Sequence, residues 1–348
     1  NPTAHVCFYG LYAPLHAEHL RRAGADTILG GEPEQALVAL ADALAAGAPA
    51  PDAPAPAPLR RLPYLVPARE GLPPPSAYTR LVIAGEQRLT GNVLATRGCK
   101  HMCRHCPIPA VYGGRFFAVP VEVVLEDARR QIAAGARHLT FADPDFLNGP
   151  THALAIARGL HAAHPEVTFD ATIKVDHLLS HRALLPELAA LGCVFVVSAF
   201  ESLSDPILAI LDKGHTAADA AEAVAVTRAA GLSLRPTFVA FTPWTTRADY
   251  LALGRFVGDL ELEDEVDPIQ LALRLLIPPG SLLLDRPELA PHLGALDPGS
   301  LTYAWTHPDP AMYQLAADVA ALVERAARDG EPAGETFARI MALAGAPD

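Results

Sequence analysis

Apolar segments of strand length alternate with amphipathic segments of helix length along most of the chain. We predict strands within LTGNVLATRGC (89–99), HLTFADPDF (138–146), VTFDATIKV (167–175), CVFVVSAFES (193–202), LSLRPTFVAFTPW (232–244) and PIQLALRLLIPPG (268–280). Helices are predicted over 119–136, 151–164, 178–192, 216–231 and 245–260. Strands this apolar are typical of parallel sheets buried on both faces, and the alternation implies right-handed crossovers. The pattern predicts an α/β fold, a partial (β/α)6 barrel of the TIM type.

A smaller α/β unit is predicted before the barrel. HVCFYGLYAP begins with a strand (His5–Tyr9), and HAEHLRRAGADTILGG (16–31) contains a short helix and a second strand. We expect a further part of this unit upstream, which makes it an incomplete Rossmann-like domain. Proline and alanine dominate Gly47–Pro75 and exclude helix and central strand there. The expected divisions are the α/β domain (1–47), a Pro-rich linker (48–80), the barrel (81–285) and a C-terminal helical extension (286–348).

Composition and charge narrow the partners of the chain. The net charge is −12 over 348 residues, and no run of Lys and Arg is present, so we expect no nucleic-acid partner. No apolar stretch reaches the roughly 18 residues of a membrane span, and no signal peptide is visible. Five cysteines in a chain of this length do not suggest a disulfide framework. We therefore expect a cytoplasmic protein without a membrane partner.

Polar residues follow the predicted strands. In barrels of this kind the chemistry lies at the C-terminal ends of the strands. The residues at these positions are Arg97 and Cys99, Asp143 and Asp145, Lys174 and Asp176, Glu201 and Ser202, Thr242 and Trp244, and, within the last predicted strand, Arg274. Their placement predicts a site built from the ends of several successive strands.

Three cysteines lie within eight residues, as Cys99, Cys103 and Cys106. A structural zinc site needs four ligands, and His101 or His105 could supply the fourth. A single loop with three thiolates suits a 4Fe–4S cluster better, with one iron left for a ligand that is not protein. We favour the iron–sulfur cluster, and zinc or accidental clustering remains the alternative. The other two cysteines, Cys7 and Cys193, are interpreted as small core residues.

The CxxxCxxC spacing directly after the first barrel strand resembles the radical S-adenosylmethionine (SAM) superfamily. The resemblance implies a 4Fe–4S cluster on Cys99, Cys103 and Cys106 that binds SAM at its open iron. It also implies a flavodoxin- or ferredoxin-type reductant, whose electron breaks a carbon–sulfur bond of SAM, and a small-molecule acceptor. His105 precedes the third cysteine, where family members usually carry an aromatic residue near the adenine.

The same resemblance implies SAM contacts for residues after the second and third strands. Asp143 and Asp145 would hold the SAM amine, and the alternative is an Asp-Pro turn that caps the next helix. Lys174 would pair with a carboxylate of SAM or substrate. Its alternative is a strand-end lysine whose ammonium extends to water.

Residues after the later strands are assigned in the same way. Glu201 and Ser202, in SAFES, would reach the SAM ribose, with a helix N-cap as the alternative. Lys213 precedes Gly-His215 in LDKGHT and would lie near the SAM carboxylate, with a basic helix C-terminus as the alternative. Arg274 is a charge within an apolar strand, so we interpret it as either a site residue or an edge residue.

A narrower resemblance is to the radical SAM proteins named for a CUAEP or CCAEP tail. The segments that carry it are CRHCPIPAVYGGRF, TFADPDFLNGPTHAL, TIKVDHLL, SAFES, LDKGHT, FTPWTT and RLLIPPGS. The given chain ends in MALAGAPD and lacks that tail, so the resemblance implies nothing about a tail thiol. The group resembles the radical SAM enzyme of arsinothricin biosynthesis, which implies transfer of the 3-amino-3-carboxypropyl group of SAM to arsenite.

Three other functions remain open. One is 5′-deoxyadenosyl radical chemistry on a small molecule. Another is cobalamin-dependent methylation, because GLYAPLHAEHLRRAGADTILGGEPEQAL resembles the second half of a cobalamin-binding domain. We disfavour cobalamin, since only part of that domain is covered and no clear cobalt-ligand histidine motif is seen. The non-enzymatic alternative is an iron–sulfur electron carrier, which would not need polar groups at five strand ends.

Overall fold

The computed structural model describes residues 3–50, 59, 63–78, 80–83 and 85–345. Contacts divide the chain into two compact units. The first, here called the loop unit, comprises Asn1–Pro63, Gly98–Arg115 and Leu276–Thr306. The second, here called the barrel unit, comprises Tyr64–Arg97, Phe116–Leu275 and His307–Asp348.

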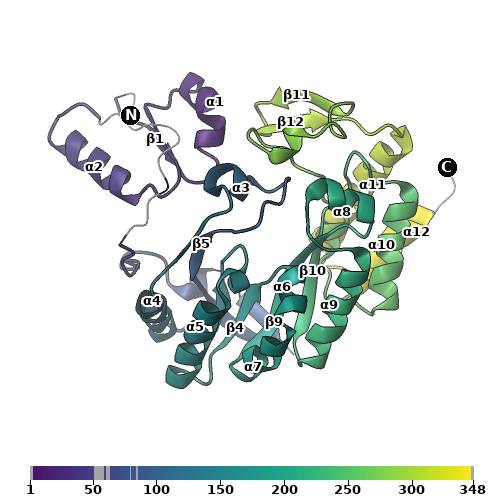
Figure 1. Ribbon diagram of the computed structural model, residues 1–348, viewed down its shortest axis with the longest axis horizontal. Helices are drawn as coiled ribbons and strands as arrows, with labels where there is room; N and C mark the ends of the chain where they lie inside the picture. The colour runs from purple at the N-terminus through teal and green to yellow at the C-terminus, as the bar shows by residue number, and fades with distance from the viewer. Residues whose placement is uncertain (1–2, 51–58, 60–62, 79, 84, 346–348) are drawn as a thin grey trace. The chain divides into compact units, whose positions relative to one another are not determined.

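The barrel unit is built on a six-stranded sheet in the order β10-β9-β8-β7-β4-β3 (Figure 1). Its strands are β3 (Arg80–Ile83), β4 (Glu86–Val93), β7 (His138–Phe141), β8 (Thr168–Thr172), β9 (Cys193–Glu201) and β10 (Ser233–Phe238). All neighbours are parallel except β3 and β4, which form an antiparallel pair. The sheet is curled as a half-barrel, which confirms the predicted partial barrel. The antiparallel edge strand β3 was not predicted.

The helices between the strands follow the predicted pattern, with two exceptions: the helix predicted over 178–192 is divided, and the helix directly after β9 was not predicted. They are α4 (Val121–Ala133), α5 (Pro150–Ala163), α6 (Val175–Ser180), α7 (Leu185–Ala190), α8 (Asp205–Leu211), α9 (Ala217–Ala229) and α10 (Arg247–Asp259), with the 3-10 turns η3 (Phe146–Asn148) and η4 (Arg182–Leu184). The single helix predicted over 178–192 is wrong, because Pro186 starts a new helix and cannot continue an old one. Capping boxes at Thr216 and Thr246 begin α9 and α10.

Alternation along the strands separates an apolar face from a polar one. Leu139, Phe141 and Phe169 belong to the large buried core of this unit. Their sequence neighbours Thr140 and Asp170 point to the opposite face, because successive strand residues alternate in direction. In register, Thr90 opposes His138 and His138 opposes Thr168. The face opposite the apolar core is therefore lined with hydroxyl, imidazole and carboxylate groups.

The predicted sixth strand is wrong in its extent. Pro268–Leu271 forms a 3-10 helix (η5), capped by the Asp267 side chain, which accepts from the Ile269 N–H. Beyond it, a single parallel bridge joins Phe241 to Arg274. Pro268 begins the 3-10 turn, and prolines at 278 and 279 remove the backbone donors that a longer ladder would need.

The loop unit contains several small elements. They are β1 (Cys7–Tyr9), β2 (Thr27–Leu29), η1 (Pro14–His16), α1 (Ala17–Arg22), α2 (Glu34–Ala45), α3 (Pro107–Tyr112), η6 (Leu282–Asp285), β11 (Leu293–Asp297) and β12 (Thr302–Trp305). Strands β1 and β2 are parallel, as an α/β unit requires. These two short strands do not confirm the predicted Rossmann-like domain, which stays a prediction. The antiparallel β11–β12 pair lies within the segment predicted to be helical and was not foreseen.

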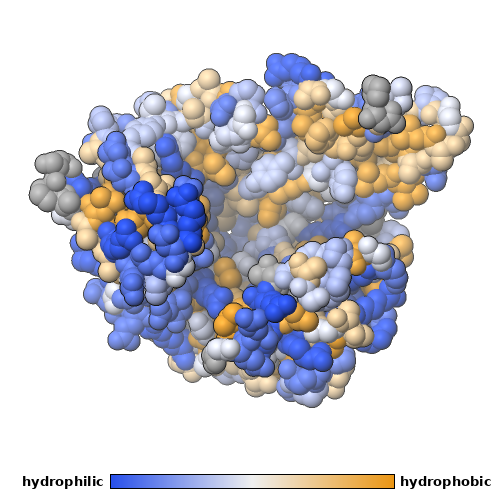
Figure 2. Space-filling model, turned by 180° about the vertical axis from the view of Figure 1, so that it is seen from behind, coloured by the Kyte–Doolittle hydropathy of each residue, from blue (hydrophilic) through white to orange (hydrophobic). Residues whose placement is uncertain are grey.

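Five further elements complete the described secondary structure. They are β5 (Thr96–Gly98), β6 (Phe116–Ala118), η2 (Pro75–Ala77), α11 (Pro310–Asp329) and α12 (Ala333–Gly345). The predicted linker lies partly outside the described residues, at 51–58, 60–62 and 79. In the part of the chain that the structure describes, no helix is long and apolar enough to cross a membrane. On the face shown in Figure 2, hydrophilic and hydrophobic residues are interspersed, as is usual for protein surfaces.

Candidate active site

The three clustered cysteines lie on one loop of the loop unit. Cys99 and Cys103 are buried, and Cys106 is partly exposed. The N–H of Cys106 donates to the Cys103 carbonyl at 3.1 Å. Cys106 has extended backbone angles at the N-cap of α3, and Pro107 follows it as the first helical residue. The loop therefore carries three cysteines, none of them in a disulfide, on a turn and at a helix start.

Close backbone approach holds the two ends of this loop together. Gly98 has φ of +77°, and a Cβ there would lie 2.5 Å from the Arg115 carbonyl oxygen and from the Tyr112 ring. Only glycine fits such a position. The Tyr112 hydroxyl donates to Glu32 at 2.8 Å, and both side chains are buried. The loop is thus fixed from both sides within its own unit.

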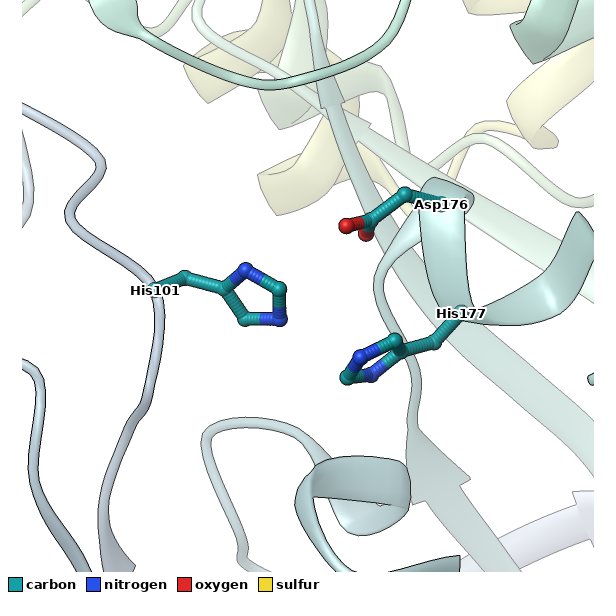
Figure 3. A group of neighbouring side chains, drawn as sticks. All are labelled: His101, Asp176 and His177. Carbon is teal, nitrogen blue, oxygen red and sulfur yellow. The ribbon is translucent and has the colours of Figure 1, made fainter. Parts of the chain in front are cut away.

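The donor set fits an iron–sulfur cluster. Three thiols on one loop, none of them in a disulfide, match the ligand chemistry of a 4Fe–4S cluster with one iron open. Cys99, Cys103 and Cys106 are the residues that would hold it. His101 and His105 belong to the same loop, and Figure 3 shows the His101 ring projecting from it.

Asp143 holds the chain directly before this loop. Its carboxylate accepts from the Ala95 N–H at 3.0 Å and from the Thr96 hydroxyl at 2.5 Å. Burial raises the pKa of Asp143 to about 6, and the hydrogen bonds from Thr96 and Ala95 oppose that rise. The geometry therefore gives Asp143 a positioning role at the end of the first parallel strand. Contact with the SAM amine remains a prediction.

Asp143→Asn should change how stability depends on pH. The folded pKa of about 6 lies above the usual 3.8, so the fold favours the protonated acid. The contribution of protonated Asp143 to the free energy of unfolding is fully present below pH 3.8 and is lost as pH rises through 6. The total loss is about 3 kcal/mol. The asparagine variant does not titrate at this position, so its free energy of unfolding should not show this decrease. Denaturant unfolding from pH 4 to 8 should show the wild type losing stability relative to the variant.

A matched control for this titration is Asp297→Asn. Hydrogen bonds from Ser300 and Gly299 lower the pKa of Asp297, so its contribution has the opposite sign and fades as pH falls. A difference curve for Asp143 that stays flat across pH 4 to 8 would contradict the assignment.

Asp145 serves the local backbone and a histidine. Its carboxylate accepts from the Leu147 N–H at 3.1 Å and caps the 3-10 turn η3, whereas the next helix, α5, has Gly149 at its N-cap and no side-chain cap. The same carboxylate lies 2.6 Å from His177 Nδ1, and both side chains are buried. Figure 3 shows His177 and Asp176 as successive residues at the start of α6. His177 was not predicted as a site residue, although it follows the predicted site residue Lys174 by only three positions.

Three predicted residues from separate elements meet at the C-terminal ends of β8 and β9. The Lys174 ammonium donates to the Lys213 carbonyl and lies 3.3 Å from Asp176. The Lys213 ammonium lies 3.3 Å from the Glu201 carboxylate. Lys174, Glu201 and Lys213 are 8%, 8% and 3% exposed, so these charges are almost entirely removed from water. We call Lys174, Asp176, Glu201 and Lys213 the strand-end cluster.

Backbone strain accompanies this cluster. Glu201 has φ of +65° and Asp212 has φ of +55°, in the left-handed region that non-glycine residues rarely occupy. The pairing register between β9 and β10 also shifts between Thr237 and Phe238, and Phe238 pairs with Glu201. Strain of this kind is concentrated at functional sites. Ser202, the next residue, accepts from the Ser204 N–H at 3.1 Å through its hydroxyl.

His215 is held neutral beside the two lysines. Burial, together with the charges of Lys213 and Lys174, lowers the pKa of His215 to about 4. Its Nε2 lies 3.3 Å from the Phe200 carbonyl oxygen and donates to it. At neutral pH, His215 therefore adds no positive charge to the strand-end cluster.

Arg274 lies in the single bridge to Phe241. It is exposed, and its guanidinium lies 4.8 Å from the centre of the Tyr313 ring on α11. A role for Arg274 in cofactor binding remains a prediction.

Comparison with known proteins identifies the family of this region. Residues 93–244 match the model of the radical SAM superfamily. A bacteriochlorophyllide d C-12(1)-methyltransferase of Chlorobaculum tepidum is 31% identical over 139 residues, which span 38% of this chain and only 29% of that protein. The chain therefore corresponds to less than a third of that relative's length.

Two solved structures resemble this chain over most of its length. One is the radical SAM methyltransferase TsrM of Kitasatospora setae with tryptophan substrate and a SAM analogue (TM-score 0.65, 16% identity, 91% of this chain, 71% of that chain). The other is the cobalamin-dependent radical SAM enzyme OxsB with aqua-cobalamin and SAM (TM-score 0.64, 16% identity, 87% and 55%). At this identity the likeness concerns the fold. Residues 93–244 of the chain therefore form a radical SAM superfamily domain.

Proposed function

We propose that this protein is a radical SAM enzyme that transfers a carbon group of SAM to a small molecule. The observation that carries the proposal is the set of three cysteines on one loop, none of them in a disulfide, within a region that matches the superfamily. When bound there, a 4Fe–4S cluster supplies the electron that breaks a carbon–sulfur bond of SAM. Cys99, Cys103 and Cys106 would hold the cluster, and the protein would orient SAM and exclude water.

The strand-end cluster supplies groups suited to SAM. The ammonium groups of Lys174 and Lys213 are complementary to a carboxylate, and Glu201 can accept hydrogen bonds from ribose hydroxyls. These charges are nearly inaccessible to water, so a bound ligand would feel them strongly. We assign recognition of the SAM carboxylate and ribose to these three residues.

Cobalamin-dependent methyl transfer is the first candidate reaction. The two solved relatives that cover 87% and 91% of this chain are a cobalamin-dependent radical SAM enzyme and a radical SAM methyltransferase. The parallel strands β1 and β2 agree with the incomplete Rossmann-like, cobalamin-binding-like domain inferred from the sequence. Cobalamin is therefore better supported than the sequence alone indicated. We assign no residue of the loop unit to it.

Transfer of the 3-amino-3-carboxypropyl group to arsenite is the second candidate. It rests on the motifs shared with the CUAEP/CCAEP-tail proteins, of which LDKGHT and SAFES contribute Lys213 and Glu201 to the strand-end cluster. Both candidate reactions need a small-molecule acceptor and a flavodoxin- or ferredoxin-type reductant.

Identification of the nucleoside product tests the proposal. The protein is purified without oxygen, its cluster is reconstituted, and SAM and a reductant are added with and without cobalamin. Adenosylhomocysteine is expected for methyl transfer, and methylthioadenosine for aminocarboxypropyl transfer. 5′-Deoxyadenosine alone would indicate hydrogen abstraction. No SAM consumption by a cluster-loaded sample would contradict the enzyme and leave the electron carrier.

A further inference from the structure

The barrel unit contains a cavity that is lined in part by polar side chains and lies away from the strand-end cluster. A cavity of about 770 Å³ lies against residues of β4, β7, β8 and β9. Leu72, Pro74 and Tyr78 form one wall, and Phe195 of β9 contributes to the other. His138, Thr140 and Asp170 line it from β7 and β8. An apolar enclosure with a few convergent polar groups is typical of a ligand site.

Asp170 is the polar group that remains open to a ligand. Its side chain is only 7% exposed. The Oδ1 atom accepts from His138 Nε2 at 2.7 Å and from the Thr140 hydroxyl at 2.7 Å. Among the described residues, no hydrogen bond or ion pair reaches Oδ2. Asp170 lines the cavity, so a donor on a ligand bound there can reach this carboxylate.

His138 is already engaged and cannot take a ligand itself. Its Nε2 donates to Asp170, and its Nδ1 lies 2.8 Å from the Thr168 hydroxyl. The ring is fully buried and lies parallel to that of Phe195, with centroids 6.0 Å apart. His138 therefore orients the Asp170 carboxylate, and Oδ2 is the atom that faces a ligand.

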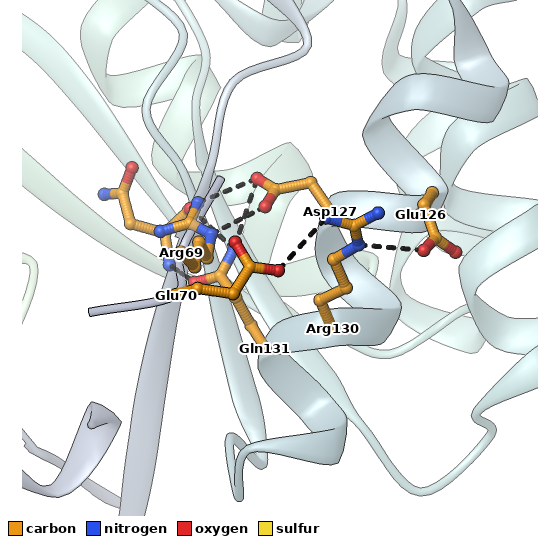
Figure 4. A network of polar contacts seen from close by, with 7 residues as sticks. Arg69, Glu70, Glu126, Asp127, Arg130 and Gln131 are labelled. Atoms are coloured by element: carbon orange, nitrogen blue, oxygen red, sulfur yellow. Dashed lines mark hydrogen bonds and ion pairs between the residues drawn. The ribbon is translucent and has the colours of Figure 1, made fainter. Parts of the chain in front are cut away.

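The arginines around the cavity are already engaged. Arg69 donates two hydrogen bonds to Asp127, at 2.6 and 2.8 Å, and Arg130 donates to Glu126 at 2.9 Å (Figure 4). Arg69 also donates to the Asn92 carbonyl, which ties the wall segment to β4. Arg80 is exposed and donates to Gln87, so water screens its charge. Each of these three lining arginines therefore already has a hydrogen-bond acceptor among the described residues, and a fourth arginine, Arg235, lies with its guanidinium 3.8 Å from the centre of the Phe195 ring.

We propose that this cavity binds a small primary amine with an apolar body. The ammonium group donates to Asp170 Oδ2, and the body lies between Phe195 and the segment Leu72–Tyr78. Asp170 precedes Lys174 by four residues, about 13 Å along an extended chain. The site is therefore distinct from the strand-end cluster. Its occupation needs no SAM and does not depend on the proposed function.

Calorimetric titration of the full, cluster-reconstituted protein without SAM tests this site. Three probes of matched size are used, namely phenethylamine, 2-phenylethanol and phenylacetate. We expect phenethylamine to bind tightest, phenylethanol more weakly and phenylacetate not at all. Asp170→Asn should weaken phenethylamine binding about ten-fold or more, because a hydrogen bond between charged groups is lost. Asp318→Asn, on α11, is the matched control and should leave the Kd unchanged.

A second variant keeps the test decisive if Asp170→Asn folds poorly. Leu72 is 55% exposed, so Leu72→Ala should fold normally and weaken binding about three- to ten-fold through lost apolar contact. Equal affinity for the three probes, no binding of any probe, or wild-type affinity in either variant would overturn the proposal. Because the readout is binding without SAM, failure here is separable from failure of the enzyme assay.

Discussion

Replacing Cys103 by alanine is expected to abolish SAM cleavage, by at least about 10³-fold, because the chemistry resides in the cofactor. Cys103 is buried in the middle of the three-thiol loop, and its carbonyl accepts from the Cys106 N–H. Alanine removes one iron ligand and leaves that backbone hydrogen bond in place. The variant should therefore fold and fail to hold a stable cluster. Iron and sulfide content per chain, and nucleoside products by mass, measure the two effects separately.

The control for this experiment is Cys193→Ala. Cys193 is also a buried free cysteine, but it lies on β9, and burial raises the pKa of its thiol well above the usual value. We expect full iron content and SAM cleavage, with a stability loss of about 1 kcal/mol. Wild-type iron content and activity in Cys103→Ala would contradict the assignment of the loop to a 4Fe–4S cluster.

Much of the barrel unit follows from local sequence patterns. Strands such as the one in VTFDATIKV are marked by runs or alternation of apolar residues. Helices such as α9 and α10 are marked by capping boxes at Thr216 and Thr246. Both signals are local, so they can be read from a short window. The failures come from non-local or competing effects. PIQLALRLLIPPG is apolar enough for a strand, yet its prolines limit it to one bridge at Arg274.

Several residues of the strand-end cluster were predicted from the sequence, but the contacts between them were not. Lys174, Glu201 and Lys213 were each singled out from a separate strand end or loop, and the fold brings them within ion-pair or hydrogen-bond distance. The pairing of Asp145 with His177 was missed, since nothing local to either residue reports the other. The open carboxylate oxygen of Asp170 was missed for the same reason. Its environment depends on His138 from the neighbouring strand.

Lys213→Met is expected to be the most destabilising change in the strand-end cluster. Lys213 and Glu201 are 4% and 10% exposed at their side chains, with 3.3 Å between ammonium and carboxylate. Removing one partner leaves the other charge buried, which costs about 3–5 kcal/mol. Glu201 cannot easily turn away, because its backbone is held at φ of +65° at the end of β9. Denaturant unfolding at neutral pH measures the loss.

The control is an exposed ion pair of the same unit. Arg182 and Glu222 lie 2.8 Å apart with side chains 53% and 46% exposed, so Arg182→Met should cost less than about 1 kcal/mol. Lys213→Arg keeps the charge and should recover most of the stability lost in Lys213→Met.

SAM kinetics separate the structural role of Lys213 from the proposed ligand role. If Lys213 also binds the SAM carboxylate, Lys213→Arg should raise the KM for SAM while remaining folded, because the guanidinium cannot occupy the position of a compact ammonium. A purely structural Lys213 would give a stable arginine variant with unchanged KM. A Lys213→Met protein as stable as wild type would contradict the buried pair itself, since an unpaired carboxylate at Glu201 cannot be accommodated without cost.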